Sequence, residues 1–128
     1  LSNADFVSIN CVLSPASHHL VNSDTFALMK STAVLINAAR GPIVEEKALI
    51  EALRSKRLAG AALDVFEVEP LPLDSPLMKM DNVLLAPHNS NSSPAAWERV
   101  HWNTIKNLVE GLGIPFSYTD FTDDTEKT

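Results

Sequence analysis

The sequence has a single cysteine, no long apolar run and no surplus of basic residues, and these gaps rule out several kinds of protein. Cys11 has no second cysteine in the chain with which to form a disulfide or a cysteine-based zinc site. No apolar stretch is long enough to cross a membrane, and no basic segment leads into an apolar core as in a signal peptide. The formal net charge of −6 argues against nucleic acid or an anionic membrane as the main partner. We therefore expect a cytoplasmic protein.

A length of 128 residues allows one domain with a modest core, or one part of a larger domain. The chain does not begin with methionine, and we expect it to be a piece of a longer protein. Cys11 lies in an apolar run, which predicts a packed and chemically inert thiol. The polar, acidic sequence near the end predicts a disordered tail, so we expect a folded part at residues 1–113 and a tail at 114–128.

Short apolar runs alternate with segments of helical periodicity, which indicates a parallel α/β sheet with right-handed crossovers. The expected strands are residues 6–11, 33–39, 61–65 and 83–86, and the expected helices are residues 24–30, 45–57 and 94–112. Ser23 or Asp24 is expected to cap the first helix and Ser93 the last. The proline-rich residues 70–81 are expected to form a loop that inserts Leu77 and Met78 into the core.

The second helix has a clear apolar stripe of Leu49, Ile50 and Leu53, with Gly60 expected in its stop region. The last helix has an apolar face wider than one sheet needs, which indicates a second packing partner. That face is formed by Trp97, Val100, Ile105, Leu108 and Leu112, with Trp102 and Val109 to its side.

Arg40, Glu69 and His88 each come just after one of the predicted strands. The carboxyl ends of parallel strands meet at one edge of a sheet, and open α/β sheets bind their ligands at that edge. A guanidinium, a carboxylate and an imidazole at one edge can hold a small anion and move a proton. The pattern therefore predicts a site for an anionic substrate with acid–base chemistry.

Two of these side chains also have a purely structural alternative. Arg40 could cap a loop or a helix terminus, and His88 could be a structural histidine. Glu67 is interpreted as a solvated loop charge, whereas function is assigned to Asp64 and Glu69. His18, His19 and His101 lack the context of His88, which follows a strand and a proline, and they are given no functional role. No pair of histidines or acids has a recognised metal-ligand spacing, so no metal site is expected.

Three segments carry a family resemblance: INAARGPIVEEKALIEAL (residues 36–53), AGAALDVFEVEP (59–70) and NVLLAPH (82–88). They resemble the second half of the nucleotide-binding domain of the D-isomer-specific 2-hydroxyacid dehydrogenases. The resemblance implies a partial Rossmann-like parallel sheet of about four strands with flanking helices. Residues 1–113 would then be the C-terminal part of a dinucleotide-binding domain.

The resemblance also implies roles for individual residues. Arg40 would orient a small 2-oxo acid, His88 would protonate its carbonyl oxygen, and Glu69 would hydrogen-bond His88. The residues implied at the NAD or NADP cofactor are Cys11, Ala38, Ala39 and Asp64, with Asp64 near the nicotinamide end. A carboxylate beside an imidazole favours the imidazolium, which suits a proton donor.

Several positions depart from the family pattern. Val12 stands where the family usually has proline, Pro42 where it often has glycine, and residues 89–93 replace small or apolar residues and glycine, so the substrate is not named. Glu69 argues against the formate dehydrogenase branch, which has glutamine there. The G-x-G-x-x-G turn, its acidic partner and the substrate-binding domain are missing from the chain.

Two functional hypotheses follow. In the first, the protein is an NAD(P)-dependent oxidoreductase acting on a small 2-oxo or 2-hydroxy acid. In the second, the chain is a non-catalytic fragment that serves as an interaction or oligomerisation module through aromatic surface around Trp97 and Trp102. Half a parallel sheet leaves an open edge and face, so we expect a homodimer or pairing with a missing N-terminal half.

Overall fold

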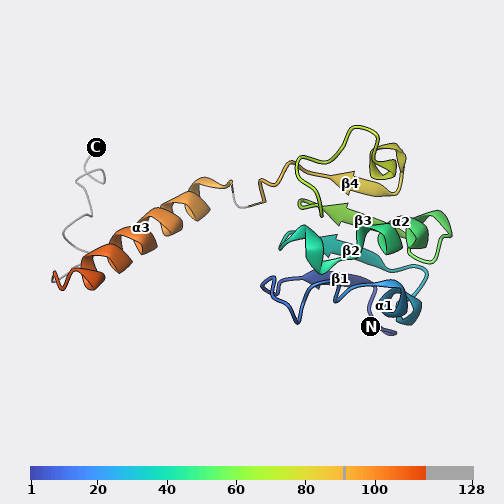
Figure 1. Cartoon of the computed structure of the whole chain (residues 1–128), viewed down its shortest axis with the longest axis horizontal. Helices are drawn as coiled ribbons and strands as arrows, with labels where there is room; N and C mark the ends of the chain where they lie inside the picture. The colour runs from blue at the N-terminus through green and yellow to red at the C-terminus, as the bar shows by residue number, and fades with distance from the viewer. Residues whose placement is uncertain (91, 115–128) are drawn as a thin grey trace, which may run out of the picture. The chain divides into compact units, whose positions relative to one another are not determined.

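The computed structural model describes residues 1–90 and 92–114, which belong to two units, one of residues 1–90 and one that follows it (Figure 1). The first unit contains a four-stranded parallel sheet of β1 (Phe6–Ile9), β2 (Val34–Asn37), β3 (Gly60–Leu63) and β4 (Val83–Leu85). The spatial order of the strands is β1-β2-β3-β4, the same as their order in the chain. The predicted fold class is therefore confirmed.

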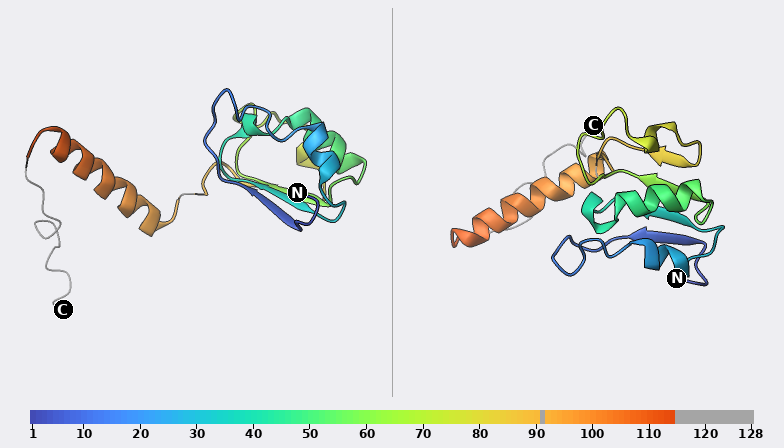
Figure 2. Two further views of the ribbon diagram at one scale, coloured as in Figure 1. Left: turned by 90° about the horizontal axis from the view of Figure 1, so that it is seen from below. Right: turned by 45° about the vertical axis from the view of Figure 1, so that its right-hand side comes forward.

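Two helices cover one face of this sheet. They are α1 (Ser23–Leu28) and α2 (Glu46–Arg54), and Figure 2 shows both on the same side of the strands. The covered rows of side chains are Val7–Leu35–Ala61–Val83 and Ile9–Asn37–Leu63–Leu85, as the register of the strands sets them. Leu35, Leu63 and Ala61 are buried there together with Leu49 and Leu53 of α2.

The opposite face of the sheet is open within the 1–90 unit. Successive side chains on a strand alternate between faces, so Ser8, Ile36, Ala62 and Leu84 form one row on this side. Phe6 is 70% exposed and Leu84 is 71% exposed. Parallel sheets normally have both faces covered, so this face lacks a layer in the unit.

The helix ends differ from the sequence expectation in detail. Neither Ser23 nor Asp24 caps α1: Asn22 does so, because its side chain accepts from the backbone N–H groups of Asp24 and Thr25. Gly60 is not part of the stop after α2 but begins β3. The helix instead ends at Arg54 with Ser55 as its C-cap, and Lys56 follows with a left-handed φ of 56° and an N–H that donates to the carbonyl oxygen of Leu53.

The strands are shorter than their apolar runs, since hydrophobic sequence continues past the last ladder position. Cys11 lies beyond β1 and is exposed, so the prediction of a packed thiol is wrong.

In the 70–81 segment, η2 (Pro76–Lys79) buries Leu77 completely, whereas Met78 is 48% exposed, so only Leu77 enters the core.

The second unit contains α3 (Pro94–Gly111), and Ser93 caps it as predicted by accepting from the N–H of Ala96. No residue of α3 is buried. Trp97, Val100 and Leu108 of its apolar face are more than half exposed. Apart from Ile114, the predicted tail at residues 114–128 lies outside the described residues.

Candidate active site

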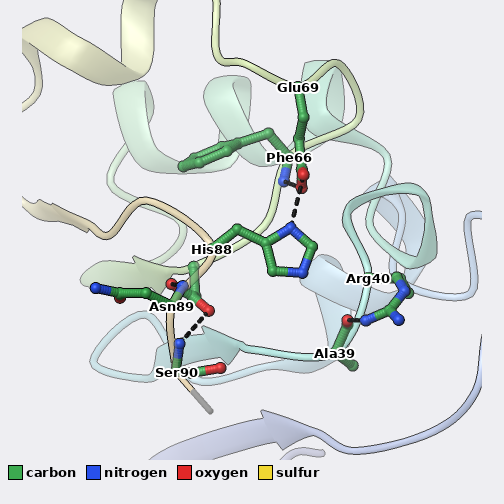
Figure 3. Close-up of polar contacts among 8 residues, drawn as sticks. Ala39, Arg40, Phe66, Glu69, His88, Asn89 and Ser90 are labelled. Carbon is green, nitrogen blue, oxygen red and sulfur yellow. Dashed lines mark hydrogen bonds and ion pairs between the residues drawn. The ribbon is translucent and has the colours of Figure 1, made fainter. Parts of the chain in front are cut away.

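His88 is held at the carboxyl edge of the sheet, three residues after the end of β4. Its Nδ1 lies 2.7 Å from Oε2 of Glu69 (Figure 3), and a carboxylate can only accept, so Nδ1 carries the hydrogen. The other carboxylate oxygen of Glu69 accepts from the backbone N–H of Phe66 at 3.0 Å. Figure 3 shows the second ring nitrogen on the side of His88 that faces Arg40. The sequence prediction that Glu69 and His88 come together is therefore met by the geometry.

The surroundings of Glu69 favour its ionised form. The hydrogen bond with His88 holds the pKa of the Glu69 carboxyl below its usual value, and the N–H of Phe66 and the charge of Arg40 act in the same direction. Glu69 is therefore a carboxylate at neutral pH. The carboxylate that accepts from Nδ1 fixes the orientation of the His88 ring.

Arg40 follows β2 and is positioned by its neighbours in the chain. The side chain of Asn37, only 1% exposed, accepts from the N–H of Ala39 and donates to the carbonyl oxygen of Arg40. The guanidinium itself is exposed and donates through Nη1 to the carbonyl oxygen of Ala39 at 2.7 Å. Most of its five N–H donors are thus not used in this bond, and they suit a carboxylate.

Gly41 brings the segment of Arg40 against the segment of Glu69. A Cβ built on Gly41 would overlap the carbonyl oxygen of Phe66, and it would also crowd the backbone nitrogen of Glu67. Only glycine permits this backbone contact. The close approach is therefore what places the loop after β2 beside the loop that carries Glu69.

A groove of about 490 Å³ lies at the carboxyl ends of β1 and β2. Its lining residues are Ile9, Asn10, Cys11, Val12, Leu13, Ala38, Ala39 and Arg40. Three of the four residues implied at the cofactor, Cys11, Ala38 and Ala39, are thus brought together with Arg40. Asp64 is not among the lining residues.

Asp64 is instead buried, with 6% of its surface exposed, and contacts the residues after His88. Its two carboxylate oxygens accept from the backbone N–H groups of Asn89 at 2.8 Å and Ser90 at 2.9 Å. Burial acts against ionisation, but the hydrogen bonds from Ser90 and Asn89 outweigh it and hold the pKa of Asp64 below its usual value.

Glu67 is more than a solvated loop charge, which corrects the sequence interpretation. Its carboxylate pairs with Nε2 of His19, and its N–H donates to the side chain of Glu46 at 3.3 Å. Burial, with added repulsion from Glu67, raises the pKa of Glu46 against the effect of that hydrogen bond. His19 and Glu67 are 48 positions apart, and no local pattern in the sequence joins them.

Membrane-spanning helices and metal-binding clusters are both absent from the part of the chain that the structure describes. No helix there is long and apolar enough to span a bilayer. In the same residues, no group of three or more histidine, cysteine, aspartate or glutamate side chains is arranged to hold a metal ion.

The arrangement matches a known family. The model of the D-isomer specific 2-hydroxyacid dehydrogenase, NAD binding domain, matches residues 1–90, and the chain belongs to this family. The chain is 48% identical over 112 residues to a glyoxylate reductase of Thermofilum pendens. The matched region covers 88% of this chain and 33% of the relative. The chain thus spans about a third of the length of such curated relatives.

Solved structures of the family have the same fold. One is the D-isomer specific 2-hydroxyacid dehydrogenase of Xanthobacter autotrophicus Py2 in complex with NADPH and MES, with 51% identity, a TM-score of 0.68, and coverage of 69% of this chain and 28% of that one. Another is the NAD-complexed enzyme of Lactobacillus delbrueckii ssp. bulgaricus, with 29% identity, a TM-score of 0.76, and coverage of 91% and 39%.

Proposed function

We propose that the protein that contains this chain transfers a hydride from NAD(P)H to a small 2-oxo acid such as glyoxylate or hydroxypyruvate, or from a 2-hydroxy acid of the phosphoglycerate type to NAD(P)⁺. The observation that carries this proposal is the Glu69–His88 pair beside Arg40 at the carboxyl edge of the sheet. Membership of the dehydrogenase family supports it. The name of the Thermofilum pendens relative supports glyoxylate as the first substrate to test.

In this proposal Arg40 binds the substrate carboxylate with two parallel hydrogen bonds and fixes the position of the adjacent carbonyl. The bound nicotinamide supplies the hydride that the carbonyl carbon receives. His88 donates the proton that the carbonyl oxygen takes up, so that the product is the 2-hydroxy acid and the imidazole is left neutral. Glu69 keeps the imidazole oriented through Nδ1 and stabilises its cationic form.

The cofactor is proposed to lie in the groove lined by Cys11, Ala38 and Ala39. The small side chains of the two alanines allow a flat ring to approach the backbone at the end of β2. Solved relatives contain NADPH in one case and NAD in another, so we propose NAD or NADP without choosing between them. Asp64, which the resemblance implies near the nicotinamide end, is not among the residues that line this groove. A cytoplasmic location and a homodimer stay predictions.

The experiment is an assay of the complete gene product with NADH or NADPH and each of glyoxylate, hydroxypyruvate and pyruvate. We expect oxidation of at least one reduced cofactor, with the 2-hydroxy acid formed in equal amount. A folded protein that oxidises neither cofactor with any of these acids would contradict the proposal.

A second candidate is an interaction or oligomerisation module without catalysis. The observation that favours it is the exposed apolar face of α3, on which Trp97 is 53% and Leu108 is 62% exposed. A phosphate-binding glycine turn encoded upstream of Leu1 in the same reading frame would remove most of its support.

A further inference from the structure

Asp64 is an almost fully buried carboxylate whose hydrogen bonds go to backbone rather than to a side-chain cation. The two N–H groups that it binds belong to Asn89 and Ser90, which follow His88 directly. Both residues are otherwise exposed at the surface. A buried carboxylate at the end of β3 therefore anchors a surface segment that begins after β4.

His88 needs such an anchor because of its backbone conformation. Its φ of 55° lies in the left-handed region, which is uncommon for residues other than glycine, although histidine, asparagine and aspartate adopt it more often than the rest. Conformations of this kind persist where the surrounding structure fixes them. On one side of His88 the ring of Pro87 limits the backbone, and on the other side the next two N–H groups are bound by Asp64.

The ring of His88 is fixed separately, by Glu69 through Nδ1 at 2.7 Å. Two carboxylates from one segment after β3 thus act on one histidine, Asp64 on its backbone and Glu69 on its ring. If the backbone of residues 88–90 rotated out of the left-handed conformation, the Cβ of His88 would point elsewhere and the bond to Glu69 would be lost.

We propose that Asp64 is a positioning residue, which holds residues 88–90 through the N–H groups of Asn89 and Ser90 so that the His88 ring meets Glu69. The catalytic consequence rests on the proposed function, whereas the structural one does not. The lowered pKa of Asp64 supports the proposal, since the carboxylate is ionised at neutral pH and its bonds are charge-assisted. The alternative is that Asp64 acts by direct contact with the cofactor.

The first test does not depend on catalysis. Amide hydrogen exchange of Asn89 and Ser90 is measured in the complete gene product, in Asp64→Asn and in Asp5→Asn, a control at the amino end of β1. We expect slow exchange in the parent and the control, and exchange faster by about tenfold to a hundredfold in Asp64→Asn. Fast exchange in the parent itself would overturn the proposal, and this measurement decides the matter even if Asp64→Asn does not fold.

The second test separates positioning from cofactor contact. Asp64→Asn should lower kcat for the 2-oxo acid on the order of a hundredfold while leaving the dissociation constant of NAD(P)H unchanged. In a His88→Ala background, the same substitution should lower kcat no further, because Asp64 acts through His88. Weaker cofactor binding, or an undiminished loss of kcat in that background, would overturn the positioning role. An inactive parent would count against the proposed function, and the exchange result would still stand.

Discussion

Asp64 and Glu69 come from the same segment after β3, and the structure gives these two carboxylates different partners. Glu69 binds a ring nitrogen of His88 and the N–H of Phe66, and it is partly exposed. Asp64 is buried and accepts from the backbone N–H groups of Asn89 and Ser90. Both have a lowered pKa, but only Asp64 is buried enough for its ionisation to matter strongly to folding.

Asp64 is expected to stabilise the fold only while it is ionised. A group whose pKa is lowered by folding contributes stability above its unfolded value, here 3.8, and the contribution disappears as pH falls through the folded value. The melting temperature of the parent should therefore fall more steeply than that of Asp64→Asn when the pH is lowered from about 4. Equal slopes for the parent and Asp64→Asn would contradict this role.

Arg40 is expected to bind substrate through the planar fork of its guanidinium. Arg40→Lys keeps the charge but loses the two parallel hydrogen bonds, so kcat/KM for the 2-oxo acid should fall by about tenfold to a hundredfold. The matched control is Arg54→Lys in the last turn of α2, which should leave kcat/KM unchanged. Steady-state kinetics with saturating cofactor measure both. An Arg40→Lys variant with parental kcat/KM would exclude a bidentate clamp.

Some features of single residues could be predicted from the sequence and others could not. The positions of Arg40, Glu69 and His88 at the carboxyl edge of the sheet were predictable, because each residue follows a strand and the carboxyl ends of parallel strands meet at one edge. The exposure of Cys11 was not, because hydrophobic sequence runs on past the last ladder position of β1. The His19–Glu67 pair joins two loops that are distant in sequence, and only the fold brings them together.

The strands and helices themselves were predictable in type and order, since continuous apolar runs and a 3.6-residue period separate the two clearly. Their ends were less so. Asn22, Ser23 and Asp24 can all cap a helix, and Asn22 is selected by its reciprocal hydrogen bonds with Thr25 three residues later. Which candidate caps depends on backbone geometry that composition does not show.

The contact between the Gly41 turn and the Phe66–Glu67 backbone holds the loop of Arg40 beside the loop of Glu69. Gly41→Ala should lower the free energy of unfolding by about 1–3 kcal/mol, because backbone on the other side cannot rotate away as a side chain can. Gly111→Ala is the matched control, since a Cβ there meets no atom within 4 Å. It should be neutral or slightly stabilising within α3.

Denaturant unfolding of the parent and the two glycine variants measures these changes in the free energy of unfolding. Equal stability of the parent and Gly41→Ala would show that the two loops do not need their close approach.

In the 1–90 unit, helices α1 and α2 cover one face of the sheet and the other face is open. The open face carries Phe6 and Leu84, and parallel sheets are normally covered on both sides. Exposed apolar side chains on an open sheet face favour association. The family supplies the context, since the chain spans only about a third of the length of its curated relatives.

The isolated chain is therefore expected to self-associate, and Leu84→Asp should reduce that association by placing a charge on the open face. Leu73→Asp is the control, because Leu73 is 87% exposed in the loop before η2. Sedimentation over a range of concentrations gives the mass of each. A parent chain that stays monomeric throughout, or equal association of the parent and Leu84→Asp, would contradict the expectation.

The most direct test of the proposed chemistry is the effect of His88→Ala on hydride transfer by the complete gene product. General acid catalysis by a positioned side chain contributes on the order of 10²- to 10⁴-fold, so kcat for reduction of the 2-oxo acid should fall by that factor. Binding of NAD(P)H, followed by fluorescence, should be unchanged, because His88 is not among the residues that line the cofactor groove. A His88→Ala variant that reduces the 2-oxo acid at the parental rate would refute the assignment of His88 as the proton donor.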